Sequence, residues 1–321
     1  MHIAIEAPLS WGANADMGAI DPAFSGRAFW APIGTHHNVP ARIPGYIIRP
    51  DIRRWVLHAI ESSVTGKGRV NLLFSGPRGS GKSTGPEQLF AALGIPVDRK
   101  NAGPSTIATE LVALQSYNQA QGHHLVPGPM FRAITKGYPF ILNEAFLMDP
   151  GELMELADLV ERGIFTLPNG DEIEAAPGFV LILTDNTNGS GDLTGRHAGV
   201  QTQNAALLDR VVVLKVGYMD ESDELRAALG PYGDDDIVVA EATPIAKRVI
   251  QFANSVRKSS VMGGQFSTRQ VIEICKDVIA FSPLSDAGVD PFEFVLEGRV
   301  LGKLSDEERQ ATHRLLQGLA T

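Results

Sequence analysis

A single octapeptide, Gly76–Ser83, constrains the fold of this chain more than any other part of its sequence. Its letters, GPRGSGKS, match the pattern G-x-x-x-x-G-K-[ST] at every fixed position. The apolar run Val70 to Ser75 precedes it and predicts a buried strand, and a segment with helical periodicity follows. The motif requires this order, because the amides of the loop and of a helix N-terminus must converge on a phosphate. The sequence therefore predicts a phosphate-binding loop; the alternative is an ordinary glycine-rich turn.

Each part of this loop has a physical role in holding a nucleotide. Glycines let backbone N–H groups approach the phosphates without interference from a Cβ atom. Lys82 brings a full positive charge to the β and γ phosphates, and the Ser83 hydroxyl can ligate Mg²⁺. The expected cofactors are therefore ATP and Mg²⁺. The predicted nucleotide-binding residues are Gly76, Pro77, Arg78, Gly79, Ser80, Gly81, Lys82, Ser83 and Thr84.

Strands and helices alternate around the loop. Besides the buried strand at 70–75, the sequence predicts a second buried strand at 139–142 and further strands at 95–100, 179–183 and 211–216, the one at 95–100 weakened by Pro96. Helical periodicity is found at 51–60, 81–93, 105–115 and 150–162. Asp51 is the candidate N-cap of the first of these helices. This alternation predicts an α/β fold, a parallel sheet with helices on both faces.

The predicted organisation has four parts. They are an extended N-terminal arm over 1–48, an α/β nucleotide-binding domain over 49–217, an acidic linker region over 218–240 and a small helical lid domain over 241–321. Two inserts interrupt the α/β domain. The first, at about 116–129, reads as a hairpin or loop inside a helix, and the second, at 163–177, carries a Pro-Asn-Gly-Asp turn that favours a hairpin.

The run Pro139 to Leu142 leads into the polar pair Asn143-Glu144. ATPases with a phosphate loop place an acidic residue at the tip of a second strand, beside Mg²⁺. Glu144 is placed to orient or deprotonate an attacking water. Asn143 stands where aspartate is usual, and its amide keeps an oxygen acceptor without the negative charge. We therefore expect ATP to bind with Ser83 and Asn143 at the Mg²⁺, and hydrolysis to be slow or unusually Mg²⁺-dependent; the alternative is that the pair merely ends a strand.

Three more polar residues are candidates for completing the site. Asn186, after the strand at 179–183, could hold the attacking water, or it could simply cap a turn. Arg210 could reach the nucleotide of a neighbouring subunit as an arginine finger; the alternative is a surface arginine paired with Asp209. Arg269 starts a predicted lid helix whose N-cap is Ser267 or Thr268, and it could reach the γ phosphate or remain a solvated charge.

Composition limits the other classes of protein. The 321 residues are 44% hydrophobic and 20% charged, as in an ordinary globular protein. No apolar run approaches the roughly 18 residues that span a bilayer, and no signal peptide is visible. With Cys275 as the single cysteine, these features predict a cytoplasmic protein without a disulfide. A net charge of -9 argues against a nucleic-acid-binding face.

Two histidine pairs, His36-His37 and His123-His124, do not predict a metal site. Adjacent side chains in an extended segment point in opposite directions, so one ion rarely takes both. No nearby cysteine or carboxylate completes a ligand set. A serine hydrolase is also not supported, because no G-x-S-x-G surrounds any serine.

Taken in order, these residues resemble the AAA+ superfamily and, within it, the MoxR-like branch. The nearest resemblance is to the ATPase subunit of aerobic cobaltochelatases, the CobS type. It covers about residues 20 to 315. The segments that carry it, besides the phosphate loop up to Thr84, are Asp21 to Ser25, Gly128 to Phe131 before the second strand, 163–177, Gly191 to Gly195, and Gln201 to Arg210.

The resemblance implies roles for individual residues. Lys82 and Ser83 would bind nucleotide and Glu144 would be catalytic. Asn186 would be the first sensor, Arg210 the finger and Arg269 the second sensor. The family carries aspartate at the position of Asn143, which puts efficient hydrolysis in doubt but not nucleotide binding. The resemblance also implies a hexameric ring and a separate partner protein with a von Willebrand A domain.

Three hypotheses follow. The first is an ATP-hydrolysing ring subunit that remodels a partner protein, for metal insertion as in cobaltochelatases or as a MoxR-like chaperone. The second is a nucleotide-binding ring scaffold with weak or no hydrolysis, which Asn143 favours. The third is a DNA-translocating ATPase, which the acidic balance disfavours.

Overall fold

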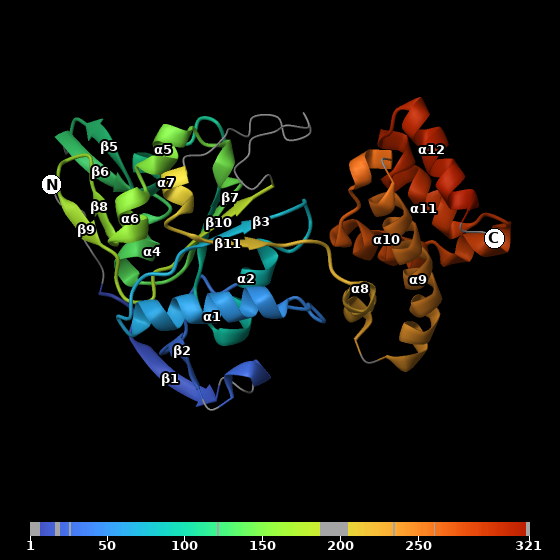
Figure 1. Ribbon diagram of the computed structural model, residues 1–321, viewed down its shortest axis with the longest axis horizontal. Coiled ribbons are helices and arrows are strands. Elements are labelled where there is room, and N and C mark those ends of the chain that lie inside the picture. The colour runs from blue at the N-terminus through green and yellow to red at the C-terminus, as the bar shows by residue number, and fades with distance from the viewer. Residues whose placement is uncertain are drawn as a thin grey trace. The chain divides into compact units, whose positions relative to one another are not determined.

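The computed structural model describes residues 7–16, 20–25, 27–120, 122–186, 205–233, 235–259 and 261–318. The chain divides into two compact units, each with its own core (Figure 1). The first unit takes in the chain up to Arg42, then Ile48–Gly76 and Gly81–Val216. The second takes in Ile43–Ile47, Pro77–Ser80 and the chain from Gly217 onward.

The first unit is built on a five-stranded sheet in the order β11-β3-β10-β7-β4, with every neighbouring pair parallel. The strands are β3 (Leu72–Ser75), β4 (Asp98–Asn101), β7 (Phe140–Asn143), β10 (Leu181–Asp185) and β11 (Val212–Lys215). The register pairs Asp185 with Ser75 and Asn101 with Asn143. The polar residues that end these strands therefore lie along one edge of the sheet, the edge where α/β folds bind ligands.

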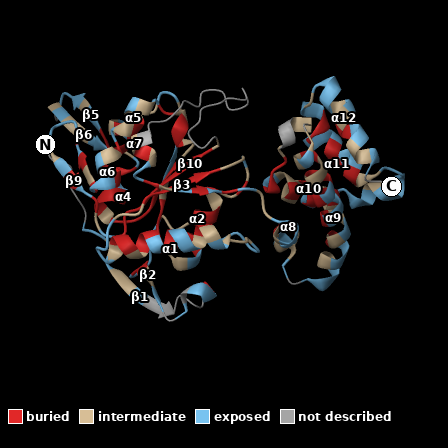
Figure 2. Ribbon diagram, in the orientation of Figure 1, coloured by how far each residue is buried: buried red, intermediate tan, exposed pale blue. Residues whose placement is uncertain are grey.

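Helices cover both faces of this sheet. On one face α1 (Pro50–Val64) and α2 (Thr84–Leu93) share a core with Leu72 and Phe74 of β3. On the other face Leu73 joins the core of the remaining helices, which are α3 (Ala108–Val112), α4 (Phe131–Lys136), α5 (Pro150–Met154), α6 (Ala157–Glu161) and α7 (Ala205–Leu208). Figure 2 shows the central strands β3 and β10 buried between these two layers. Successive positions of the central strands are apolar because both faces are covered, whereas the edge strand β4 is polar and largely exposed.

Three helix boundaries differ from the sequence prediction. Helix α1 begins at Pro50 with Arg49 as N-cap, so Asp51 lies in the first turn instead of capping it. A proline suits that first position because its missing N–H would have no intrahelical partner. The helix predicted over 105–115 ends at Val112, where β5 begins, and the one predicted over 150–162 is two short helices, α5 and α6. A short 3-10 turn, η3 (Ala145–Leu147), follows β7.

Three antiparallel hairpins extend from the first unit. The insert predicted at about 116–129 is a hairpin of β5 (Ala113–Asn118) and β6 (Gly122–Pro127). The insert at 163–177 is the predicted hairpin, with strands β8 (Ile164–Thr166) and β9 (Glu172–Glu174). In the N-terminal arm β1 (Trp11–Asp16) pairs with β2 (Ala28–Pro32), with the 3-10 turn η2 (Pro22–Phe24) between them.

The second unit is helical. It packs Phe252, Phe266 and Phe292 edge to face in its core. Its α-helices are α8 (Glu221–Leu229), α9 (Asp236–Lys258), α10 (Thr268–Ala280), α11 (Pro291–Arg299) and α12 (Asp306–Gln317). Short 3-10 turns lie between them, η4 (Gly230–Tyr232), η5 (Val261–Gly264), η6 (Ser282–Ala287) and η7 (Leu301–Lys303). Residues 218–240, expected as a linker, contribute α8 to this unit.

The predicted fold class is confirmed: a parallel sheet between helical layers, followed by a small helical region. Among the described residues, no helix has the length and apolar character needed to cross a membrane.

Candidate functional site

The phosphate loop joins the end of β3 to the start of α2. Gly76 has a φ of 152°, and a Cβ at this position would lie 2.1 Å from the Val216 carbonyl oxygen. Only glycine fits here, because any side chain would collide with backbone at the end of β11. Helix α2 then begins at Thr84 directly after Ser83, so the first amides of the helix face the loop. The strand–loop–helix arrangement predicted from the octapeptide is therefore present.

Two buried polar groups of the loop fit an anion. The Lys82 side chain donates hydrogen bonds to the Gly76 carbonyl oxygen at 2.7 Å and to Asn186 Oδ1 at 2.9 Å. Lys82 is only 8% exposed, and its ammonium group is a full positive charge within the loop, which suits an anionic ligand. The Ser80 hydroxyl is buried with no hydrogen-bond partner in the described part of the chain. Buried hydroxyls are normally satisfied, so a phosphate oxygen is a chemically suitable partner for it.

Asn143 lies at the centre of a second group of polar side chains. Its Oδ1 accepts a hydrogen bond from the Ser83 hydroxyl at 2.5 Å and a long one from the Thr184 hydroxyl at 3.4 Å. Its Nδ2 donates to Asn101 Oδ1 at 3.0 Å. Hydroxyl and amide oxygens are hard donors of the kind that Mg²⁺ accepts, although a carboxylate would bind it more tightly. Ser83 and Asn143 therefore fit a Mg²⁺ that is held mainly by nucleotide phosphates.

Glu144 has an unusual backbone conformation. Its φ is 55°, one of two positive values among the described non-glycine residues, and its N–H donates to Thr184 Oγ1 at 3.2 Å. This left-handed turn costs free energy for a residue with a Cβ, and such strain clusters at functional sites. Its carboxylate accepts a hydrogen bond from Asn186 Nδ2 at 2.5 Å. Lys82, Asn186 and Glu144 are thus joined by consecutive hydrogen bonds across β3, β10 and β7.

Arg210 is engaged within its own chain. It follows α7, and its guanidinium donates to Glu161 Oε2 at 2.6 Å and to the Ala206 carbonyl oxygen at 2.5 Å. The sequence offered a pair between Arg210 and Asp209 as the alternative to an arginine finger. In the structure Arg210 pairs with Glu161 of α6 instead. The pair is partly exposed, so breaking it costs little free energy, about 1 kcal/mol or less.

Arg269 lies in the second unit, exposed in the first turn of α10. The predicted N-cap is confirmed as Ser267, which forms a capping box with Gln270. The start of this helix is fixed by a buried ion pair: Arg257 makes two 2.7 Å hydrogen bonds to Glu224, which also accepts from the Thr268 hydroxyl at 2.7 Å. This arrangement holds the backbone that carries Arg269 in a defined position.

Sequence reasoning missed two members of the site, Asn101 and Thr184. Asn101 ends β4, the strand weakened in the prediction by Pro96, and Thr184 sits inside β10 one residue before its end. The sequence pattern that could have identified both residues is the one used for Asn143, a polar residue at the carboxyl end of a predicted strand. The single cysteine, Cys275, plays no part, because it is buried in the helical core and burial raises its pKa to about 12.

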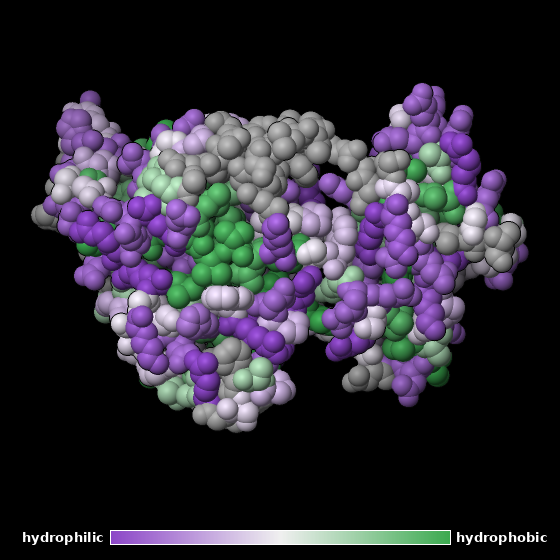
Figure 3. All heavy atoms as spheres, in the orientation of Figure 1, coloured by the Kyte–Doolittle hydropathy of each residue, from purple (hydrophilic) through white to green (hydrophobic). Residues whose placement is uncertain are grey.

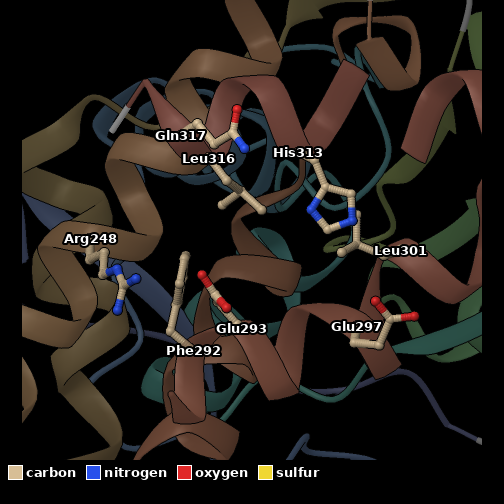
Figure 4. Close-up of a pocket in the computed structure, with 8 residues that line it drawn as sticks. All are labelled: Arg248, Phe292, Glu293, Glu297, Leu301, His313, Leu316 and Gln317. Carbon is tan, nitrogen blue, oxygen red and sulfur yellow. The ribbon is translucent and has the colours of Figure 1, made fainter. Parts of the chain in front are cut away.

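A separate pocket of about 300 Å³ lies in the helical unit, lined from α9, α11 and α12. Figure 4 shows the side chains of Glu293 and His313 facing this space. No predicted nucleotide-binding residue lines it. The described residues hold no cluster of three or more histidine, cysteine, aspartate or glutamate side chains suited to a metal ion.

The family model matches a part of the α/β unit, and the relatives and solved structures match a larger share of the chain. Residues 71–211 match the model of a protein family described as an AAA domain of the dynein-related subfamily. An uncharacterized protein of Staphylococcus haemolyticus is 28% identical over 75% of this chain and 86% of its own length. One of Staphylococcus saprophyticus is 27% identical over the same shares. A RuvB mutant of Thermotoga maritima has a TM-score of 0.49 at 15% identity, covering 82% of this chain and 73% of that one. Gly191 to Gly195 and Gln201 lie outside the described residues.

Proposed function

We propose that this protein binds ATP with Mg²⁺ and hydrolyses it, as one subunit of a ring that remodels a partner protein. The observation that carries the proposal is the hydrogen-bonded series from Lys82 through Asn186 to Glu144. It joins the cation of the phosphate loop to a carboxylate at the tip of the neighbouring strands. The match of residues 71–211 to the AAA domain family agrees with this chemistry.

The residues divide the work as follows. The loop amides and Lys82 bind the phosphates, and Lys82 offsets the negative charge that develops on the transferred phosphoryl group. Mg²⁺ would supply further charge neutralisation between Ser83 and Asn143. Glu144 accepts a proton from the attacking water, and the Asn186 amide holds that water in line. The two side chains contact each other directly at 2.5 Å, so the attacking water would replace this hydrogen bond as they move apart.

The direct test is ATP binding and steady-state ATPase turnover of the purified protein. Lys82→Ala is expected to abolish binding, because it removes the only side-chain cation that the sequence motif places on the phosphates. Glu144→Gln is expected to retain binding and to reduce turnover by about 10²-fold or more. Wild-type protein with no affinity for ATP or ADP in the presence of Mg²⁺ would refute the proposal.

Assembly is supported by the exposed edge of the sheet. Strand β11 is an edge strand, and Val213 on it is 43% exposed. Figure 3 shows apolar side chains gathered on the first unit over this part of the sheet. Exposed apolar patches mark interaction surfaces, and Arg210 lies two residues before the strand. We propose a homo-oligomeric ring in which this edge faces a neighbouring subunit and Arg210 reaches that subunit's nucleotide; a hexamer is the expected size, to be checked by mass measurement in solution with ATP.

The proposed identity of the partner protein rests on the sequence resemblance alone. A MoxR-like chaperone would work with a separate von Willebrand A domain protein, and a cobaltochelatase-like motor would bring a large tetrapyrrole-binding subunit as well. Affinity purification from the native host separates these two, because only the chelatase recovers the larger subunit.

A second candidate is a nucleotide-switched ring scaffold with weak or no hydrolysis. The observation that favours it is the neutral side chain of Asn143 beside Ser83, where a negative charge would strengthen Mg²⁺ binding. Tight ATP binding with turnover unchanged by Glu144→Gln would select the scaffold over the enzyme.

A further inference from the structure

We propose that Asn101 is a positioning residue that turns the Asn143 amide so that its oxygen faces Ser83 and the Mg²⁺ bound there. The inference rests on the proposed function, because it concerns the cation that accompanies the nucleotide. It assigns a role to a residue outside the phosphate loop, on the edge strand β4.

The geometry is a pair of cross-strand neighbours. Strands β4 and β7 run parallel, and their register places Asn101 directly beside Asn143. Asn143 Nδ2 donates to Asn101 Oδ1 at 3.0 Å, while Asn143 Oδ1 accepts from the Ser83 hydroxyl at 2.5 Å. The two ends of the amide therefore have different partners on opposite sides.

The chemistry of the amide explains why this matters. A carboxylate presents an oxygen to a cation in either orientation, because its two oxygens are equivalent. An amide has one acceptor and one donor end, and the wrong orientation places an NH₂ group against the cation. An acceptor on the far side fixes the correct orientation, in the way that partners of metal ligands commonly do. Among the described residues, the hydrogen bonds of Asn143 Nδ2 go to Asn101 alone.

The contact is solvent-exposed, so its effect is moderate. Water can replace part of the hydrogen bond, so the net contribution of this contact is modest. Loss of Asn101 should therefore raise the Mg²⁺ concentration needed for the half-maximal gain in nucleotide affinity by about three- to tenfold, with nucleotide binding itself retained.

The experiment measures ATP dissociation constants by isothermal titration calorimetry over a Mg²⁺ series and in EDTA. Four proteins form a double-mutant cycle: wild type, Asn101→Leu, Asn143→Asp, and both together. Asn101→Leu removes the acceptor at nearly constant size. With Asn143 present, it should raise the Mg²⁺ concentration that gives the half-maximal gain in ATP affinity by about three- to tenfold. In the Asn143→Asp background the same substitution should raise this concentration by less than about twofold. Within each background, Asn101→Leu should leave the affinity for ATP in EDTA unchanged.

The controls keep the outcomes distinct. Asn101→Asp retains the acceptor and should restore a Mg²⁺ requirement at or below that of wild type. A thermal melt of each variant confirms that it folds. An equal effect of Asn101→Leu in both backgrounds, or none in either, overturns the positioning role while the proposed function stands. Absence of ATP binding by wild type in every condition overturns both.

Discussion

Asn186 joins Lys82 to Glu144, accepting from the lysine at 2.9 Å through Oδ1 and donating to the carboxylate at 2.5 Å through Nδ2. The three side chains come from distant parts of the sequence. Lys82 and Asn186 are about a hundred residues apart. One amide thus connects the charge that binds phosphate with the base that acts on water. Both ends of the amide are used, so an ionised carboxylate, which has no donor, would lose the contact with Glu144.

Asn186→Ala is expected to lower ATPase turnover by about 10- to 100-fold, since it removes the group that positions water while leaving Glu144 in place. The dissociation constant for ATP should change by less than about threefold, because the remaining hydrogen bond of Lys82 to Gly76 is kept. Turnover and nucleotide titration on the same preparation check this. A parallel loss of affinity and turnover would indicate that Asn186 acts through Lys82 instead.

Asn143→Asp is expected to increase turnover and to reduce the Mg²⁺ concentration needed for half-maximal activity, each by about tenfold. The physical reason is that a carboxylate oxygen attracts the cation through a full charge where the amide has only a dipole. A Mg²⁺ titration of steady-state ATPase activity measures both quantities. Equal turnover and equal Mg²⁺ dependence in the two proteins would show that the neutral residue does not weaken the site.

Arg210→Ala is expected to reduce turnover by about 10³-fold if the side chain completes the site of a neighbouring subunit. The matched control is Glu161→Gln, which removes the negative charge that faces Arg210 and should leave turnover within about threefold of wild type. Activity of wild type should also rise more steeply than linearly with protein concentration. If Arg210→Ala and Glu161→Gln had the same activity, Arg210 would have no role at the nucleotide of a neighbouring subunit.

Asp21→Ala is expected to destabilise the first unit by about 2 kcal/mol, less than the ~3–5 kcal/mol of a fully buried pair because both partner arginines reach solvent. Asp21 is completely buried and accepts hydrogen bonds from Arg53 and Arg54 of α1, so it anchors the arm to that helix. The control Asp51→Ala removes a partly exposed carboxylate that pairs with Arg49 and accepts a hydrogen bond from the Ile52 N–H, and it should cost about 1 kcal/mol or less. Urea unfolding of both variants measures the difference.

The same carboxylate predicts a dependence of stability on pH. The hydrogen bond from Arg54, with further help from Ala23 and Arg53, lowers the pKa of Asp21 from 3.8 to about 2 against the opposing effect of burial. A lowered folded-state pKa contributes stability that is complete above about pH 4 and is lost as the pH falls toward 2. The free energy of unfolding of wild type should therefore drop in this window, and that of Asp21→Ala should drop less.

The phosphate loop shows what the sequence determined by itself. Its glycines and Lys82 are adjacent in the chain, so local pattern alone predicts strand, loop and helix, and the structure has all three. The apolar runs likewise predict the sheet, because strands covered on both faces must be apolar throughout. Local signals do not fix where a helix stops: α3 gives way to β5 at Ala113 because a hairpin partner is available there.

Only the tertiary structure decided which polar residues meet. The end of a predicted strand marks Asn101 as a polar residue, but the sequence does not show which residue it meets; the parallel register of β4 and β7 brings it to Asn143. In the same way the pairing of Arg210 with Glu161 joins α6 to the residue after α7, segments 49 positions apart. Side-chain contacts of this kind depend on strand order and helix packing, which are set by the burial of the whole core. A sequence pattern specifies the elements, whereas their packing specifies the site.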